Sequence, residues 1–99
     1  MIIVVGEAVG RLETIDELRR ASIEHVRRSR TEDGCIEHSV FVDCENEQRL
    51  FFFERWRDAA ALKAHFAVED ARLFAKALGA LTARKPRMTI YNAEETAAG

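Results

Sequence analysis

Three consecutive phenylalanines at positions 51–53 place the strongest constraint on the fold of this chain. In an extended strand, alternate side chains point to opposite faces, so Phe51 and Phe53 share one face and Phe52 points to the other. A run that is apolar on both faces is typical of a strand in the middle of a sheet whose two sides are both covered. The fold must therefore supply a covering layer on each side of this strand.

The same strand, predicted at 49–56, also carries a carboxylate and the only tryptophan of the chain. Alternation places Glu54 and Trp56 on the same face as Phe52. Burial of an ionised carboxylate without partners is costly, so Glu54 requires a hydrogen bond or an ion pair. An arginine or a helix N-terminus would give Glu54 a structural role, whereas orienting His65 or binding a substrate would give it a functional one.

Four strands and three helical segments are predicted along the chain. The strands are 2–9, 35–43, 49–56 and 87–92. A first helix is expected to begin at residue 15, after a capping box over Thr14–Glu17, and to stop before Asp33-Gly34. Asp58 is predicted to cap a short helix, and a further helix follows it and ends at Gly79.

This order, β-α-β-β-α(α)-β, predicts an α+β fold: a ferredoxin-like sandwich in which helices cover one face of a four-stranded antiparallel sheet. Strands one and three are central in that topology, and they are the two most apolar strands here. The 99 residues fit a single domain over 1–99, with about 94–99 as a frayed tail. No element remains for the second face of the sheet, so we expect a homodimer packed through that face.

Composition and charge argue against several partners and locations. Fifteen Lys and Arg against seventeen Asp and Glu give a formal net charge of −2, which provides no general attraction for nucleic acid or an anionic membrane. The arginines of the helix after residue 15 are interleaved with acidic residues at i,i+4, as on an ordinary solvated face. The chain shows neither a signal peptide nor a membrane span, so we expect a cytoplasmic protein.

Neither the cysteines nor the histidines suggest a covalent or metal-bound centre. Cys35 and Cys44 lie at opposite ends of one predicted strand, about 30 Å apart, which is too far for a disulfide. The histidines at 25, 38 and 65 lack the local spacing of a metal motif such as CxxC or HxxxH. We therefore expect reduced thiols and no metal.

Three short motifs carry a resemblance to a known family. They are Gly34-Cys35, Val42-Asp43-Cys44 and the pattern Glu54-x-Trp56-x5-Leu62-x2-His65. Together they resemble the antibiotic biosynthesis monooxygenase (ABM) family, and within it the small quinol-monooxygenase-like proteins. The resemblance implies a dimeric α/β-barrel assembly of ferredoxin-like domains. It also implies oxidation of aromatic phenols or hydroquinones by molecular oxygen without metal, flavin or other cofactors, although other members isomerise small molecules and a related branch degrades haem.

The chain departs from the family pattern at several positions. Asp33 stands where a proline is common, and His38 stands where many relatives have a tyrosine. The residues Val68-Glu69-Asp70 replace a frequent Pro-His pair. Strand one has no asparagine at Val5-Gly6-Glu7, where the haem-degrading branch would need one. The substrate of a named relative is therefore not transferred to this chain.

The candidate site combines a base, polar groups and aromatic walls. His65 is the candidate base, because imidazole titrates near neutral pH. Trp56 and Glu54 complete the catalytic set implied by the resemblance, although a core tryptophan, a structural glutamate and a histidine packed on Trp56 remain the alternatives. The expected substrate-binding residues are His38, Phe52, Phe66, Phe74 and Tyr91.

Three classes of function follow from this site. The leading prediction is a cofactor-independent monooxygenase that acts on a small aromatic phenol or hydroquinone. The second is a non-oxidative enzyme of the isomerase type that uses His65 and Glu54 as acid and base. The third is a dimer that binds a hydrophobic metabolite without turnover.

Overall fold

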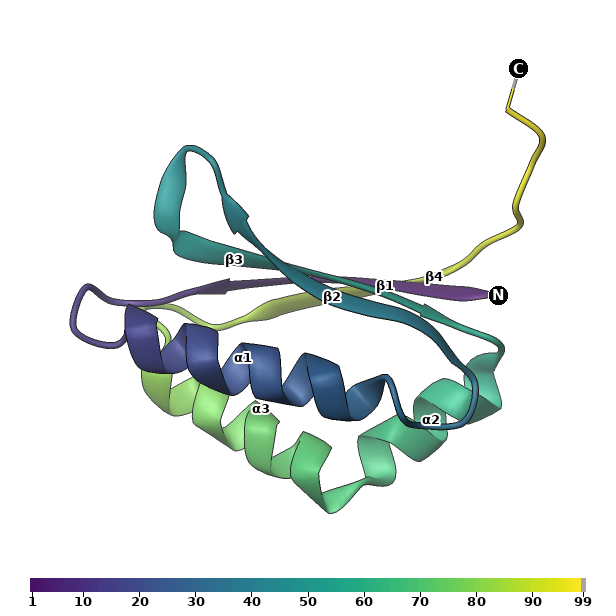
Figure 1. Cartoon of the computed structure of the whole chain (residues 1–99), viewed down its shortest axis with the longest axis horizontal. Helices are drawn as coiled ribbons and strands as arrows, with labels where there is room; N and C mark the ends of the chain where they lie inside the picture. The colour runs from purple at the N-terminus through teal and green to yellow at the C-terminus, as the bar shows by residue number, and fades with distance from the viewer. Residues whose placement is uncertain (99) are drawn as a thin grey trace.

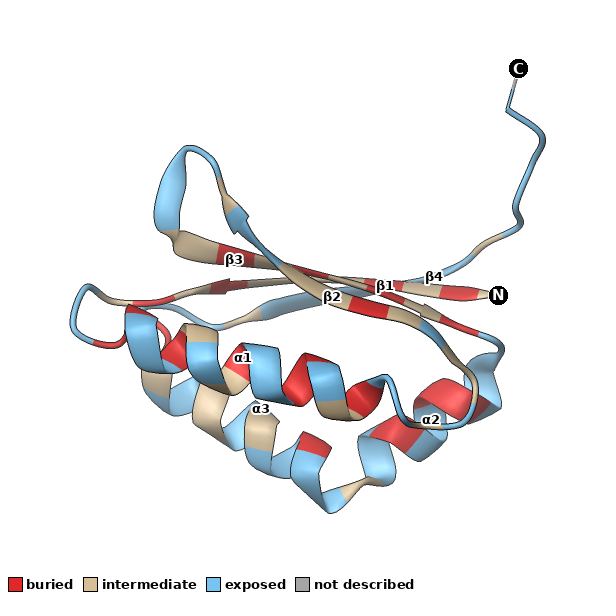
Figure 2. Cartoon of the chain, in the orientation of Figure 1, coloured by how far each residue is buried: buried red, intermediate tan, exposed pale blue. Residues whose placement is uncertain are grey.

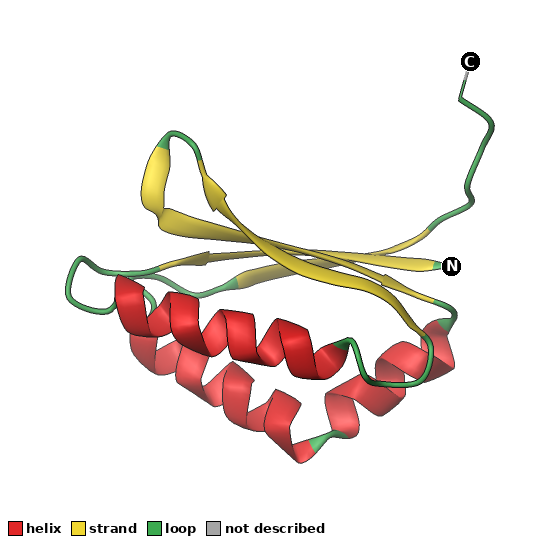
Figure 3. Ribbon diagram, in the orientation of Figure 1, coloured by secondary structure: helices red, strands yellow, loops and turns green. Residues whose placement is uncertain are grey.

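A twisted four-stranded sheet forms one layer of the molecule, and three helices packed against one of its faces form the other (Figure 1). The computed structural model describes residues 1–98. The strands are β1 (Ile2–Val9), β2 (Cys35–Asp43), β3 (Asn46–Trp56) and β4 (Arg87–Asn92), and the helices are α1 (Ile15–Ser29), α2 (Ala59–Ala67) and α3 (Glu69–Leu81) (Figure 3). No helix of the described chain is long and apolar enough to cross a membrane.

The order of strands in the sheet is β2-β3-β1-β4, and each neighbouring pair is antiparallel. Strands one and three are therefore central, as their apolar sequences predict. The predicted α+β ferredoxin-like architecture is confirmed. Residues 94–98 of the expected tail belong to neither a helix nor a strand, and residue 99 lies outside the described residues.

The apolar core lies between the sheet and the helices, where Figure 2 shows buried residues on the facing sides of both layers. Alternation along β3 directs Leu50, Phe52, Glu54 and Trp56 into this space. Trp56 and Leu18 are fully buried in two neighbouring clusters of the core. The predicted inner face of the third strand is thus correct residue by residue.

The outer face of the sheet is not covered by any element within residues 1–98 (Figure 1). Phe51 and Phe53 are half-buried there, and Phe41 and Tyr91 are about half exposed. An ion pair of 2.7 Å between Arg49 Nε and Glu7 Oε2 lies on the same face, next to Phe51. The chain thus presents aromatic surface on a face without a layer of its own.

Two local predictions are wrong in detail. Thr14 precedes α1 without a side-chain capping bond: its hydroxyl accepts from the backbone N–H of Arg11 and donates to the carbonyl of Leu81. The helix α3 continues past Gly79 to Leu81, because an isolated glycine lowers helix stability without preventing the helix. The predicted cap on α2 is confirmed, since Asp58 Oδ1 accepts from the N–H of Ala61.

The turn between α1 and β2 depends on Gly34. Its backbone adopts φ +84°, a region that residues with a side chain rarely occupy. A Cβ at this position would also lie 2.5 Å from the Cβ of Ala61 in α2. Glycine therefore allows the turn and the close packing of α2 against it.

Gly34→Ala should destabilise the protein by at least about 1–2 kcal/mol, because the left-handed conformation is strained and the new methyl group collides with Ala61. Gly79→Ala is the matched control: its Cβ would meet nothing within 4 Å, so the better helix former should add about 0.5–1 kcal/mol. Urea denaturation of both variants measures the difference. Equal stabilities would contradict the role given to this turn.

Candidate active site

A cavity of about 280 Å³ lies between the sheet and α3, and we call it the inner cavity. Its floor is the inner face of β1 and β3, and α3 forms its roof. Side chains of α1, α2 and the start of β4 close its ends. The residues that line it are Gly6, Glu7, Ala8, His25, Phe52, Glu54, His65, Phe66, Ala71, Phe74, Ala75, Leu78, Gly79, Pro86, Arg87 and Met88.

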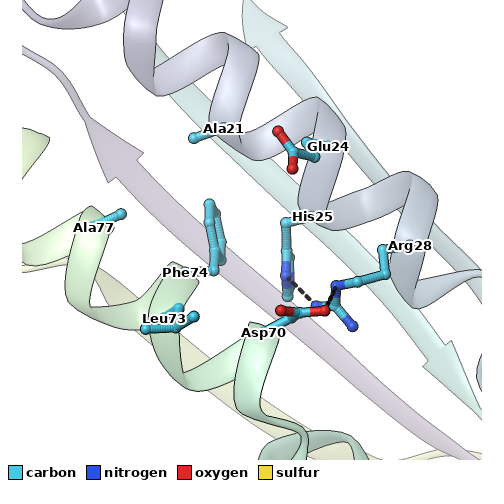
Figure 4. Close-up of a pocket in the computed structure, with 8 residues that line it drawn as sticks. All are labelled: Ala21, Glu24, His25, Arg28, Asp70, Leu73, Phe74 and Ala77. Atoms are coloured by element: carbon cyan, nitrogen blue, oxygen red, sulfur yellow. Dashed lines mark hydrogen bonds and ion pairs between the residues drawn. The ribbon is translucent and has the colours of Figure 1, made fainter.

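A second hollow of about 290 Å³, the outer groove, lies between α1 and α3 (Figure 4). Its lining residues are Ala21, Glu24, His25, Arg28, Asp70, Leu73, Phe74 and Ala77. His25 and Phe74 line both hollows. Their rings stack almost parallel with centroids 4.0 Å apart, so this pair separates the groove from the inner cavity.

His65 lies in the last turn of α2, and only 3% of its surface is exposed. Its Nδ1 is 2.8 Å from Oε1 of Glu32, in the turn after α1. A carboxylate can only accept, so Nδ1 carries the proton and Nε2 keeps its lone pair when the ring is neutral. The ring also packs on Trp56, with centroids 4.7 Å apart. Glu32 and Trp56 therefore fix the orientation of the imidazole beside the inner cavity.

The carboxylate of Glu54 is buried and lines the same cavity. The indole Nε1 of Trp56 donates to its Oε1 over 2.9 Å, and His38 Nε2 lies 3.3 Å from the same oxygen. Burial by itself raises the pKa of this carboxyl group, but the contacts with His38 and Trp56 outweigh it and leave the pKa lowered. Glu54 is therefore an anion held in the interior by an imidazole and an indole.

His38 lies behind Glu54 on β2, with 1% of its surface exposed. Its separation of 3.3 Å from Glu54 is an ion-pair contact without the alignment of a hydrogen bond. Within residues 1–98, neither ring nitrogen of His38 has a hydrogen-bond partner. Such a group is rare in a folded protein, because an unpaired buried polar atom costs about 1–3 kcal/mol.

His25 comes from the buried stripe of α1 and meets the other two histidines. Its ring centroid is 5.3 Å from that of His38 and 5.4 Å from that of His65. Arg28 Nη2 lies 3.1 Å from its Nδ1, and because a guanidinium can only donate, Nδ1 accepts. Burial, followed by the positive charges that His38, His65 and Arg28 can carry, lowers the pKa of His25 to about 3.

Comparison with known proteins is decisive at this point, because the sequence profile of antibiotic biosynthesis monooxygenases (ABM) matches residues 1–77. The chain belongs to the ABM family. The crystal structure of a protein from Deinococcus radiodurans, provisionally assigned to the same family, superposes with a TM-score of 0.94 at 26% identity, covering 99% of this chain and 97% of that one. The family resemblance of the sequence motifs is thus confirmed.

Other relatives of this ABM protein extend the comparison. Rv0793 from Mycobacterium tuberculosis shares the fold, with a TM-score of 0.89, 23% identity and coverage of 98% of each chain. The uncharacterized protein sll1783 from Synechocystis is 32% identical over 95 residues, which are 96% of this chain and 65% of that protein. The chain therefore spans about two thirds of the length of this curated relative.

The structure of the ABM domain brings together most of the residues predicted from the sequence. Five of them line the inner cavity: Phe52, Glu54, His65, Phe66 and Phe74. Trp56 and His38 lie directly behind this lining, where they contact Glu54. Tyr91 is a correction: it pairs with Ile3 of β1 on the outer face, so it does not point into the cavity.

Two residues of the site escaped the sequence analysis. Glu32, not Glu54, contacts and orients His65, and nothing in the sequence distinguishes it from a solvated acid of the turn. His25 could have been found, because it continues the buried stripe of α1 that includes Leu18 and Ser22. The expected partner of Glu54 was an arginine or a helix N-terminus, whereas its contacts are an indole and an imidazole.

His25 should make the protein less stable as the pH falls. Its pKa is about 3 in the folded chain against the ordinary histidine value of 6.5, so below pH 6.5 the unfolded chain binds a proton that the folded chain does not bind. Above pH 6.5, titration of His25 therefore causes no loss of stability. Between pH 6.5 and about pH 3, it lowers the free energy of unfolding by up to about 1.4 kcal/mol per pH unit.

His25→Phe keeps an aromatic ring against Phe74 and removes the titrating nitrogen. Urea denaturation from pH 7 to pH 4 should show a shallower loss of stability in this variant than in the original protein. The same slope in both proteins would mean that His25 is protonated in the folded chain.

Proposed function

We propose that the protein is a cofactor-independent monooxygenase that oxidises a small aromatic phenol or hydroquinone with molecular oxygen. One observation carries the proposal: a buried imidazole, held at Nδ1 by Glu32, lines a cavity whose walls include three phenylalanines. The volume of about 280 Å³ is at the small end of ligand sites, which favours a compact substrate. Membership of the ABM family supports the same class of reaction.

His65 acts in this proposal as the general base. Its Nε2 removes the proton of a phenolic hydroxyl, and the resulting imidazolium keeps its Nδ1–H on the Glu32 carboxylate. The anion of Glu54 also lines the cavity, and it stabilises a positive charge on the nearby imidazole. Glu54 can in addition accept a hydrogen bond from a second hydroxyl of a hydroquinone.

The deprotonated substrate supplies all the electrons for the reduction of oxygen. The phenolate transfers one electron to oxygen, and the radical pair combines to form a carbon–oxygen bond. Loss of water from the resulting peroxide gives the quinone, so one oxygen atom enters the product and the other leaves as water. The protein contributes a base and an apolar cavity formed by Phe52, Phe66 and Phe74.

A non-oxidative reaction of the isomerase type is the second candidate. It is favoured by one observation: a carboxylate, Glu54, and an imidazole, His65, both line the inner cavity. One could remove a proton from carbon next to a carbonyl group while the other returns it. Oxygen consumption separates the two candidates, because only the first reaction uses oxygen.

We also propose that the outer face of the sheet forms a homodimer. Aromatic side chains gather on this face: Phe41, Phe51, Phe53 and Tyr91. A second copy related by a two-fold axis would bury the same patch on both partners. The inner cavity lies on the other side of the sheet, so it remains within one chain.

The purified protein should consume oxygen when an electron-rich hydroquinone or polycyclic phenol is added, and His65→Ala should lower the rate at least about tenfold, because general-base catalysis contributes about 10²–10⁴-fold. An oxygen electrode measures both rates. Lys63→Ala, an exposed substitution in the same helix, is the control and should keep the original rate. Unchanged activity in His65→Ala would remove this base from the mechanism, and no uptake across a panel of phenols would contradict the proposed reaction.

Sedimentation at micromolar concentration should show a particle of twice the 11.3 kDa chain. Phe53→Glu should produce monomers, because it places a charge in the proposed interface. Leu73→Glu, an equivalent change at an exposed position of α3, should leave the dimer intact. A single 11.3 kDa species for the unmodified protein would contradict the dimer.

A further inference from the structure

We propose that His25, His38 and His65 form a binding site for one divalent transition-metal ion at the wall of the inner cavity. The chain has three histidines, and all of them meet here although they lie far apart in the sequence. They come from α1, β2 and α2, and all three are buried. One ligand atom from each lies within 4.8 Å of the other two.

His38 is the residue that most favours a bound ligand in this cluster. Both of its nitrogens are buried without an aligned hydrogen bond within residues 1–98, and only Nε2 lies near a carboxylate, 3.3 Å from Oε1 of Glu54, so Nδ1 is the nitrogen left for a ligand. A native interior seldom leaves a side chain in this condition unless a water or an ion completes its contacts. The imidazole rings next to His38 are those of His25 and His65. A metal ion can accept a nitrogen ligand from all three rings at once.

Two carboxylates lie where they support metal-binding histidines. Metal-binding histidines usually place their second ring nitrogen against a carboxylate, which fixes the ring and raises its basicity. Glu32 stands in this relation to His65, and Glu54 stands beside His38. Each of these rings therefore has one nitrogen directed at a carboxylate and the other one available. The two negative charges beside the cluster also favour a cation there.

The geometry requires a modest closure of the cluster. A Zn–N bond of about 2.0–2.1 Å places tetrahedral ligands about 3.4 Å apart, so the separations of up to 4.8 Å must shrink by roughly 1.4 Å. Rotation of the imidazole rings can supply this change without movement of the three elements. The fourth position then faces the inner cavity, which His25 and His65 both line.

Arg28 opposes the metal and must be displaced. Its guanidinium donates to Nδ1 of His25, which leaves the proton of this ring on Nε2. Ligation through Nε2 requires the proton to move to Nδ1, where the arginine can no longer donate to it. Arg28 has two other partners, Glu32 at 2.9 Å and Asp70 at 3.5 Å, so it can leave His25 without losing all of its contacts.

The ligand set selects a class of metal. Imidazole nitrogens suit Zn²⁺, Cu²⁺, Ni²⁺ and Fe²⁺, whereas Mg²⁺ and Ca²⁺ require oxygen ligands.

Bound metal would occupy the Nε2 lone pair that the proposed base uses, so metal binding and proton transfer by His65 exclude each other. Metal binding is therefore independent of the proposed oxygen chemistry, and a binding measurement tests it separately from oxygen uptake.

The test is calorimetric titration of the chelator-treated protein with ZnCl₂. One Zn²⁺ should bind per chain, and MgCl₂ should produce no binding. His38→Leu should weaken the affinity at least tenfold; because it also removes the imidazole beside Glu54, His38→Gln, which keeps an amide N–H for that carboxylate, is measured with it and should show the same loss, with circular dichroism to confirm that both variants fold. Cys44→Ser, which removes an exposed thiol, should bind like the original protein. Absence of saturable Zn²⁺ binding, or equal binding by His38→Leu, would overturn the proposal.

Two further variants test the arrangement around the ligands. Glu32→Gln should weaken Zn²⁺ binding about 10–100-fold, as loss of a carboxylate behind a ligand usually does. Arg28→Gln should bind Zn²⁺ more tightly than the original protein, because the competing donor on His25 is gone. Co²⁺ should give visible absorption bands with the original protein and not with His38→Leu. A tenfold weaker affinity in Arg28→Gln would contradict the ligand role of His25.

Discussion

Burial of the Glu54 carboxylate is the constraint around which the polar interior is arranged. The alternation of β3 directs this anion into the space under the helices, next to three aromatic or apolar neighbours on the same face. An unpaired charge there would be strongly destabilising, so the indole of Trp56 and the imidazole of His38 lie against it. The tilted contact between the rings of Trp56 and His65 then connects this arrangement to the cavity wall. These contacts join the three residues of the sequence pattern Glu54-x-Trp56 and His65.

Much of the architecture could be predicted from the sequence, because it depends on periodic patterns. Local spacing and composition predict the inner and outer faces of β3, the central places of β1 and β3, and the cap at Asp58. Two aromatic walls of the cavity follow too, since Phe52 lies on the inner face of β3 and Phe74 on the apolar stripe of α3, whereas Phe66 lines the cavity from an exposed position of α2. Periodicity determines the face of a strand or helix on which a residue lies, and for these positions the face alone places the residue in the core or at its surface.

The remaining features depend on contacts between distant segments. Tyr91 faces away from the cavity because the register of β4 against β1 pairs it with Ile3, and sequence alternation in a short edge strand does not reveal that register. Glu32 reaches His65 only because the Gly34 turn packs against α2. The three histidines were separated in the sequence by more than any local metal motif allows, and tertiary packing makes them neighbours.

The stacked rings of His25 and Phe74 have a kinetic consequence for exchange with solvent. Because both rings border the inner cavity and the outer groove, a single layer of side chains separates the two hollows. Passage of a small molecule across this partition depends on rotamer changes and leaves the helices in place. His25 is buried and accepts a hydrogen bond from Arg28, so rotation of its ring must first break this contact. Exchange of small molecules across this partition is therefore coupled to opening of the contact between Arg28 and His25.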